Sequence, residues 1–136
     1  MPIYIIKEIP IKYLMDNKPI ISILVPCFNE SENISYCINT LKSIINGLIN
    51  KNEISNKSFI YFIDDGSSDS TWKIIQKASD SNENIKGLRL SKNFGHQNAL
   101  LAGIEEVIDL CDASISIDAD LQQDPKAINK FISEFK

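Results

Sequence analysis

The residues with the clearest chemical potential in this chain are polar side chains that directly follow short apolar runs. They are Glu30, Asp64, Asp65, Lys92, Asp118, Asp120 and Gln122. Five of these seven side chains are carboxylates. Carboxylates crowded together repel and raise one another's pKa, so a fold that gathers them usually supplies a cation. The pattern therefore indicates a binding site for a positive ion.

Asp118-Ala119-Asp120 has the spacing that a divalent cation needs. Residues two apart in an extended segment point the same way, so both carboxylates can approach one ion. Mg²⁺ and Mn²⁺ prefer oxygen ligands and commonly keep one or two carboxylates, leaving other positions to water and phosphate. Gln122 could add a carbonyl oxygen or fix a bound water. A solvated acidic turn is the alternative interpretation, and the buried strand before the motif favours the metal.

Three other features allow both a structural and a functional interpretation. The segment 64–67 suits a tight strand-to-helix turn, but its carboxylates could also accept hydrogen bonds from a base or a ribose. Phe28 could stack on a base or pack in the core. His96 is the single histidine, and a lone loop histidine more often packs or hydrogen-bonds than catalyses.

The elements that must position these residues alternate between strand and helix after an irregular opening of about 18 residues. The predicted strands are 20–25, which Pro26 is expected to stop, 59–63, 85–90 and 114–117. Helical spacing of apolar residues predicts a helix after each strand. The residues with this spacing are Ile34, Ile38, Leu41, Ile45 and Leu48; Trp72, Ile75 and Ala78; Leu100, Ile104, Val107 and Ile108; and Ile128, Phe131, Ile132 and Phe135.

This alternation predicts an α/β fold with a mainly parallel sheet covered on both faces. Ligands of such sheets bind beyond the carboxyl ends of the strands, where the polar residues lie. Four strands are few for this architecture, and the chain stops inside its fourth helix. We therefore expect residues 1–18 to be an extension and residues 19–136 to be the N-terminal half of a larger, truncated domain.

Composition excludes several classes of protein. A net charge of −4 argues against a nucleic-acid binder, and a single histidine with no CxxC pair argues against zinc. The three cysteines are expected to be reduced, which implies a cytoplasmic location. The sequence has no run of about 18 apolar residues and no signal-peptide pattern at its start, so a membrane span or secretion is not expected.

Four motifs in order resemble those of family 2 glycosyltransferases with the GT-A fold, most closely the polyprenyl-phosphate and dolichol-phosphate hexosyltransferases. The motifs are Val25-Pro26-Cys27-Phe28-Asn29-Glu30, Asp64-Asp65-Gly66-Ser67-Ser68-Asp69, Lys92-Asn93-Phe94-Gly95-His96-Gln97 and Asp118-Ala119-Asp120-Leu121-Gln122-Gln123-Asp124-Pro125. Each motif is moderately specific, and the four together, over about residues 20 to 126, are highly specific. Phe28 departs from the tyrosine common at its position.

The resemblance implies a Rossmann-like nucleotide-sugar-binding domain and an inverting transfer of a hexose from a UDP- or GDP-sugar to polyprenyl phosphate. The implied nucleotide-sugar-binding residues are Pro26, Phe28, Glu30, Asp64, Asp65, Lys92 and Asp118, with the Asn93-Phe94-Gly95 loop bordering the donor. The implied ligands of Mg²⁺ or Mn²⁺ are Asp118, Asp120 and Gln122. The whole protein would then work at the cytoplasmic face of a membrane.

There are three alternative functions. The protein could be a glycosyltransferase that acts on a polysaccharide or protein acceptor, a non-catalytic nucleotide- and metal-binding module, or a receiver-like signalling domain. A receiver would need an aspartate at the end of the third strand, where this chain has Ser91-Lys92. In the resembled family the acceptor base and acceptor surface lie C-terminal to the DxD region. We therefore assign no catalytic base, and we expect these 136 residues to bind donor weakly and to show little turnover.

Overall fold

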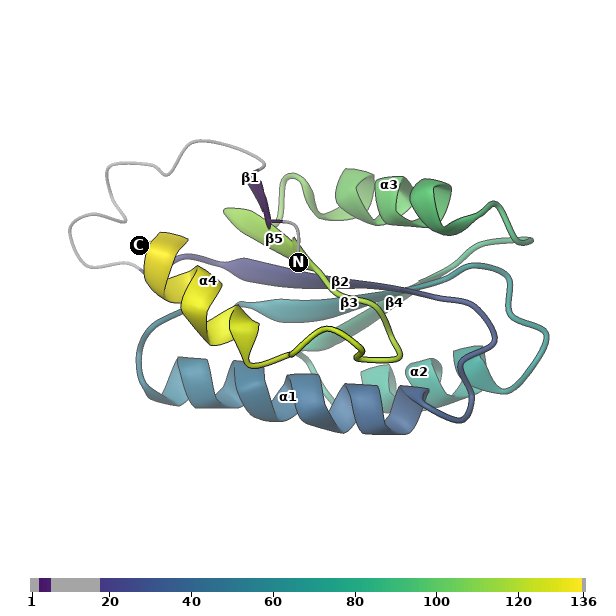
Figure 1. Cartoon of the computed structure of the whole chain (residues 1–136), viewed down its shortest axis with the longest axis horizontal. Coiled ribbons are helices and arrows are strands. Elements are labelled where there is room, and N and C mark those ends of the chain that lie inside the picture. The colour runs from purple at the N-terminus through teal and green to yellow at the C-terminus, as the bar shows by residue number, and fades with distance from the viewer. Residues whose placement is uncertain (1–2, 6–17, 136) are drawn as a thin grey trace.

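The computed structural model describes residues 3–5 and 18–135 and contains one five-stranded sheet (Figure 1). Its strands are β1 (Ile3–Ile5), β2 (Ile21–Cys27), β3 (Phe59–Asp64), β4 (Ile85–Arg89) and β5 (Ala113–Ser116). Its helices are α1 (Ile34–Asn50), α2 (Thr71–Asp80), α3 (His96–Val107) and α4 (Ala127–Phe135). The strand order is β1-β5-β2-β3-β4, with β1 antiparallel to β5 and the other pairs parallel. The predicted α/β, mainly parallel architecture is therefore confirmed.

The sheet is apolar on both faces because helices cover both of them. Ile23 and Val25 of β2 join the cluster that packs against α1, α2 and α4, whereas Leu24 points to the opposite face and packs under α3. Figure 1 shows this arrangement, with α3 on one side of the sheet and α1 and α2 on the other. Alternate β2 side chains thus enter two separate cores, and β2 becomes the buried centre of the domain.

The chain reverses its direction across the sheet at β2. The first crossovers run from β2 to β3 to β4, and their helices α1 and α2 lie on one face. The chain then returns to the other side of β2 to form β5, and the crossover helix α3 lies on the opposite face. Crossovers of one hand require this change of face when the direction reverses. A crevice at the carboxyl ends of β2 and β5 follows, which is where open α/β sheets bind ligands.

The predicted helices agree with the observed ones in place, and their predicted apolar faces are buried or partly buried except at Ile108, which follows the last residue of α3 and is 42% exposed. Every α1 residue that the helical spacing assigned to the core is buried, from Ile34 to Leu48. The helix begins at Ile34, and its N-cap Asn33 makes no side-chain capping hydrogen bond. Within residues 3–5 and 18–135, no helix is long and apolar enough to cross a membrane.

Two expectations about the strands were wrong. The opening segment is not irregular throughout, because Ile3–Ile5 pairs with β5 in the register Ile3↔Ile115, and the sheet therefore has five strands. The expectation for residues 6–17 lies outside the described residues. Pro26 also does not stop β2, which continues to Cys27.

Candidate functional site

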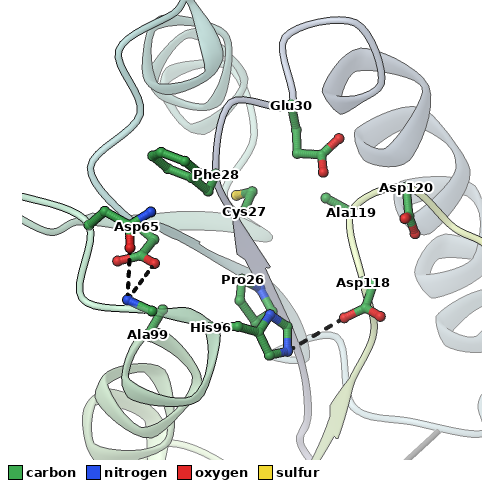
Figure 2. Close-up of a pocket in the computed structure, with 12 residues that line it drawn as sticks. Pro26, Cys27, Phe28, Glu30, Asp65, His96, Ala99, Asp118, Ala119 and Asp120 are labelled. Atoms are coloured by element: carbon green, nitrogen blue, oxygen red, sulfur yellow. Dashed lines mark hydrogen bonds and ion pairs between the residues drawn. The ribbon is translucent and has the colours of Figure 1, made fainter.

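A cavity of about 460 Å³ opens at the carboxyl ends of β2, β3 and β5, at the point where the chain reverses (Figure 2). Its lining residues come from the end of β2, from four loops and from the first turn of α3. They are Pro26, Cys27, Phe28, Glu30, Asp65, Asn93, Gly95, His96, Ala99, Asp118, Ala119 and Asp120. The cavity therefore gathers parts of all four sequence motifs.

The cavity exists because β2 and β5 separate near their ends. Their pairing runs from Ile21↔Ala113 to Leu24↔Ser116, and one further hydrogen bond joins the Ile117 N–H to the Leu24 carbonyl at 3.0 Å. Beyond that point β2 continues to pair with β3 alone. Pro26 lies in this half-paired stretch, where a missing N–H is tolerated as on an edge strand. This position explains why a proline fits inside the central strand.

Asp118 and Asp120 follow β5 and lie along one side of the cavity (Figure 2). Ala119 between them is 3% exposed and belongs to the core, so the two carboxylates flank a residue anchored beneath them. The segment is fixed by the Gln123 side chain, whose Oε1 accepts a hydrogen bond from the Asp118 N–H at 3.1 Å. Both acidic side chains thus line one cavity, although Ala119 and Asp120 lie in a turn and not in the extended segment that the spacing argument assumed.

Phe28 and Glu30 line the cavity from the loop after β2. This loop is tied to the turn after β3, because Ser67 Oγ accepts the Asn29 N–H at 2.8 Å and Thr71 Oγ1 accepts the Glu30 N–H at 2.9 Å. Phe28 remains 43% exposed, so its ring is open to a ligand in the cavity. An open aromatic surface beside carboxylates suits a ligand that has both a flat ring and polar groups.

The adjacent Asp64 and Asp65 lie in different environments. Asp64 ends β3, is fully buried and pairs with Arg89 of β4 at 3.8 Å, and it is not among the residues that line the cavity. One of its oxygens, Oδ1, has no hydrogen-bond partner among the described residues. Asp65 lines the cavity and accepts hydrogen bonds from the backbone N–H groups of Phe94 and Gly95. Two neighbouring acids therefore serve different parts of the structure.

The charge balance of the cavity is strongly negative. Four carboxylates line it, those of Glu30, Asp65, Asp118 and Asp120, and no Lys or Arg from the described part of the chain joins them. His96 Nε2 lies 3.7 Å from Asp118 Oδ1, and both side chains are about half exposed. Between residues 18 and 135, no group of three or more His, Cys, Asp or Glu side chains converges as a complete metal cage. An incomplete set of oxygen donors suits an ion that shares its coordination with a ligand and water.

Burial makes the Cys27 thiol of the cavity floor an inert group. Cys27 is 4% exposed, and burial together with the nearby Asp64 carboxylate raises the pKa of the thiol well above its ordinary value. A protonated thiol is a poor nucleophile. We therefore assign Cys27 a packing role.

Three predicted site residues lie outside the cavity lining: the buried Asp64, Lys92 and Gln122. Lys92 is exposed and its ammonium group lies 5.2 Å from the centre of the Phe94 ring. Gln122 is exposed, and its backbone N–H donates to Asp120 Oδ1 at 3.2 Å. The lining also includes Cys27, Ala99 and Ala119, which were not predicted. Only Ala119 had a signal in the sequence, since it lies between two candidate ligands.

Comparison with known proteins gives concordant results. The family model described as Glycosyl transferase family 2 matches residues 22–136. An uncharacterized glycosyltransferase of Bacillus subtilis (strain 168), YkoT, is 41% identical over 122 residues, which cover 90% of this chain and 36% of that protein. An undecaprenyl-phosphate 4-deoxy-4-formamido-L-arabinose transferase of Salmonella choleraesuis (strain SC-B67) is 32% identical over 89% of this chain and 36% of that protein.

The fold resembles those of solved structures, among them TarS and PcManGT. S. aureus TarS 1-349 in complex with UDP has a TM-score of 0.61 at 20% identity, over 85% of this chain and 32% of that one. The mannosyltransferase PcManGT from Pyrobaculum calidifontis, in complex with GDP-Man and Mn²⁺, has a TM-score of 0.56 at 18% identity, over 76% of this chain and 28% of that one. The chain spans about a third of the length of the curated relatives that it matches.

Proposed function

The chain belongs to glycosyl transferase family 2, and from this membership and the cavity we propose that it forms the donor-binding part of a glycosyltransferase. The whole protein would transfer a hexose from a UDP- or GDP-sugar, with inversion, to a polyprenyl phosphate. The observation that supports this proposal most directly is the single cavity in which Phe28, Glu30, Asp118 and Asp120 meet at the switch point of the sheet.

The acidic lining favours a donor that arrives with a divalent cation. A nucleoside diphosphate is an anion, and four carboxylates without a lining Lys or Arg would repel it. Mg²⁺ or Mn²⁺ held by Asp118 and Asp120 would balance the charge of these two carboxylates and would supply the positive charge that a diphosphate needs. The PcManGT complex contains GDP-Man together with Mn²⁺, which accords with this scheme.

The two sides of the cavity suggest how a donor would lie. Phe28 and Asp65 lie toward one side in Figure 2, and Asp118 and Asp120 toward the other. The open Phe28 face suits stacking on the nucleoside base, while Glu30 suits hydrogen bonds to base or ribose. The diphosphate would then reach the acidic side. Direct donor contacts from Lys92, Gln122 and Asp64 remain predictions.

The bound cation would act as a Lewis acid that stabilises negative charge on the leaving diphosphate. The protein would hold the cation and the donor in a fixed position relative to each other. Ala119, buried between its acidic neighbours, fixes their spacing. Phe28 would orient the nucleoside and shield that side of the cavity from water.

The proposed acceptor rests on the relatives. The Salmonella relative is named an undecaprenyl-phosphate transferase, and it is 32% identical over most of this chain. A polyprenyl phosphate would also place the whole protein at the cytoplasmic face of a membrane. The acceptor-binding residues of this chain are not assigned.

The test is a thermal-shift and calorimetric screen of UDP-glucose, UDP-GlcNAc and GDP-mannose, each with and without Mn²⁺. One donor should raise the melting temperature only when Mn²⁺ is present. At a free donor concentration of 100 times Kd, the free energy of unfolding should increase by about 2.7 kcal/mol. Asp120→Asn should abolish this rise. Asp124→Asn is the matched control, because its exposed carboxylate only accepts the Lys126 N–H at 3.0 Å. A response that Asp120→Asn leaves intact would remove the metal assignment.

A further inference from the structure

The wall of the cavity formed by the loop after β4 is held by an unusual contact. Residues 90–95 connect β4 to α3 without regular structure, and residues 91–95 form the 91–95 loop, of which Asn93 and Gly95 line the cavity together with His96. The Phe94 N–H donates to Asp65 Oδ1 at 2.7 Å, and the Gly95 N–H donates to Asp65 Oδ2 at 3.1 Å. One carboxylate thus holds two successive backbone groups of the 91–95 loop.

The burial of the Asp65 carboxylate makes its hydrogen bonds to the 91–95 loop strong. The side chain is 3% exposed and has no ion-pair partner within residues 18–135. A buried carboxylate without a cation depends on the donors that surround it. Hydrogen bonds to a charged acceptor are about twice as strong as neutral ones. The hydrogen bond from the Phe94 N–H depends on Asp65 alone, whereas the Gly95 N–H also donates to Asn93 Oδ1 at 3.0 Å.

The next residue brings the two backbones into direct contact. Gly66 has a φ of +71°, and a Cβ there would lie 2.3 Å from the Lys92 carbonyl carbon and 2.6 Å from the Asn93 nitrogen. Real Cβ atoms do not approach backbone so closely, so the turn after β3 can lie against the 91–95 loop only with glycine at this position. Asp65 therefore holds the loop by hydrogen bonds, and Gly66 allows the two backbones to lie in contact.

We propose that Asp65 is a positioning residue that acts on the donor through the 91–95 loop, with Gly66 permitting the approach. Asp65 fastens Phe94 and Gly95, and this sets the place of Asn93 and His96 on the wall of the cavity. The effect on donor binding rests on the proposed function, whereas the fastening itself does not. Asp65 thereby differs from Asp118 and Asp120, whose proposed partner is the cation.

The fastening is tested by amide hydrogen exchange of the ligand-free chain, followed by NMR. Asp65→Ala removes both acceptor oxygens and should speed exchange of the Phe94 N–H by roughly tenfold to a hundredfold, the loss expected for a hydrogen bond to a charged group. Asp65→Asn keeps one acceptor and should fall between Asp65→Ala and the native chain. It also serves if the alanine variant does not fold. Gly66→Ala should free the same N–H while keeping the carboxylate.

Asp112→Ala is the matched control at the opposite end of the sheet. Asp112 is also a buried aspartate, 2% exposed, and its Oδ2 accepts the Ile20 N–H at 2.8 Å. Its removal should lower overall stability and leave exchange at Phe94 and Gly95 unchanged. Equal effects of the two alanine variants on the loop amides would overturn the proposal, since they would reflect general destabilisation. So would unchanged loop exchange in Asp65→Asn and Gly66→Ala.

A second measurement separates this proposal from the proposed function. Donor affinity with Mn²⁺ should weaken at least tenfold more in Asp65→Asn than in Asp112→Asn, a gap of about 1.4 kcal/mol. If the native chain binds no donor while the loop amides respond as expected, the proposed function fails and the positioning role stands. If donor binds and the loop amides do not respond, the positioning role is overturned while the proposed function stands.

Discussion

Phe28 provides the sharpest test of where the nucleoside lies. Its ring lines the cavity and is 43% exposed, so the protein core gains little from it and a ligand could gain much. Stacking of a base on an aromatic side chain is worth about 1–3 kcal/mol. Because 1.4 kcal/mol corresponds to a factor of ten, Phe28→Ala should weaken nucleotide binding roughly 5- to 150-fold. The loss should be similar for UDP and GDP, since every base has a π-face.

The assay is isothermal titration calorimetry of UDP and GDP in Mn²⁺, with melting temperatures measured in parallel. Phe28→Tyr keeps the ring and should retain affinity, whereas Phe28→Leu keeps apolar area without the π-face and should lose part of it. Tyr36→Ala is the matched control, because Tyr36 is 69% exposed on α1 and is not among the cavity-lining residues. Affinity that is equal in Phe28→Ala and Tyr36→Ala would refute the stacking argument.

Two further predictions concern titrating groups. Burial raises the pKa of Asp69, but hydrogen bonds donated by Thr71 and Ser31 outweigh it and lower the pKa to about 2. Asp69 should therefore titrate by NMR near pH 2, and its stabilising contribution should be present above about pH 4 and lost as the pH falls toward 2; a midpoint near 4 would contradict this. Burial and the Glu30 carboxylate raise the pKa of Cys37 to about 12. At pH 8, Cys37 and Cys27 should resist iodoacetamide in the folded chain and react in urea, and mass spectrometry would detect modification of the native protein as the contrary result.

Much of the fold was predictable because its signals are local. The spacing of Ile34, Leu41 and Ile45 identified α1 and its buried face. Membership of glycosyl transferase family 2 and the GT-A fold, inferred from four motifs, are confirmed by the family match and by the solved structures. The strand β1 was missed because three residues in a segment broken by charges and Pro10 give no periodic signal. Its pairing with β5 depends on residues more than 100 positions away.

The role of Pro26 depended on tertiary pairing in the same way. A proline after a β-branched run usually indicates the end of a strand. Here β2 continues because its β5 partner has already departed at Leu24, which removes the need for the missing N–H on that side. The residues around Pro26 do not indicate where the pairing with β5 ends, because β5 is distant in the sequence. The same departure opens the cavity, so the feature that misled the prediction also creates the site.

The Asp64-Asp65 motif locates the turn after β3, but it does not indicate which of the two side chains faces the cavity. Both residues were grouped as nucleoside ligands, since a sequence does not reveal which of two adjacent side chains faces a cleft. The sheet register decides it: Asp64 pairs with Arg89 in the ladder between β3 and β4, which commits its side chain to the buried sheet edge. Asp65 follows the last paired residue and is free to meet the 91–95 loop. One carboxylate therefore joins the turn to the sheet and the other joins it to the cavity wall, and this division explains why the turn needs two acids in succession.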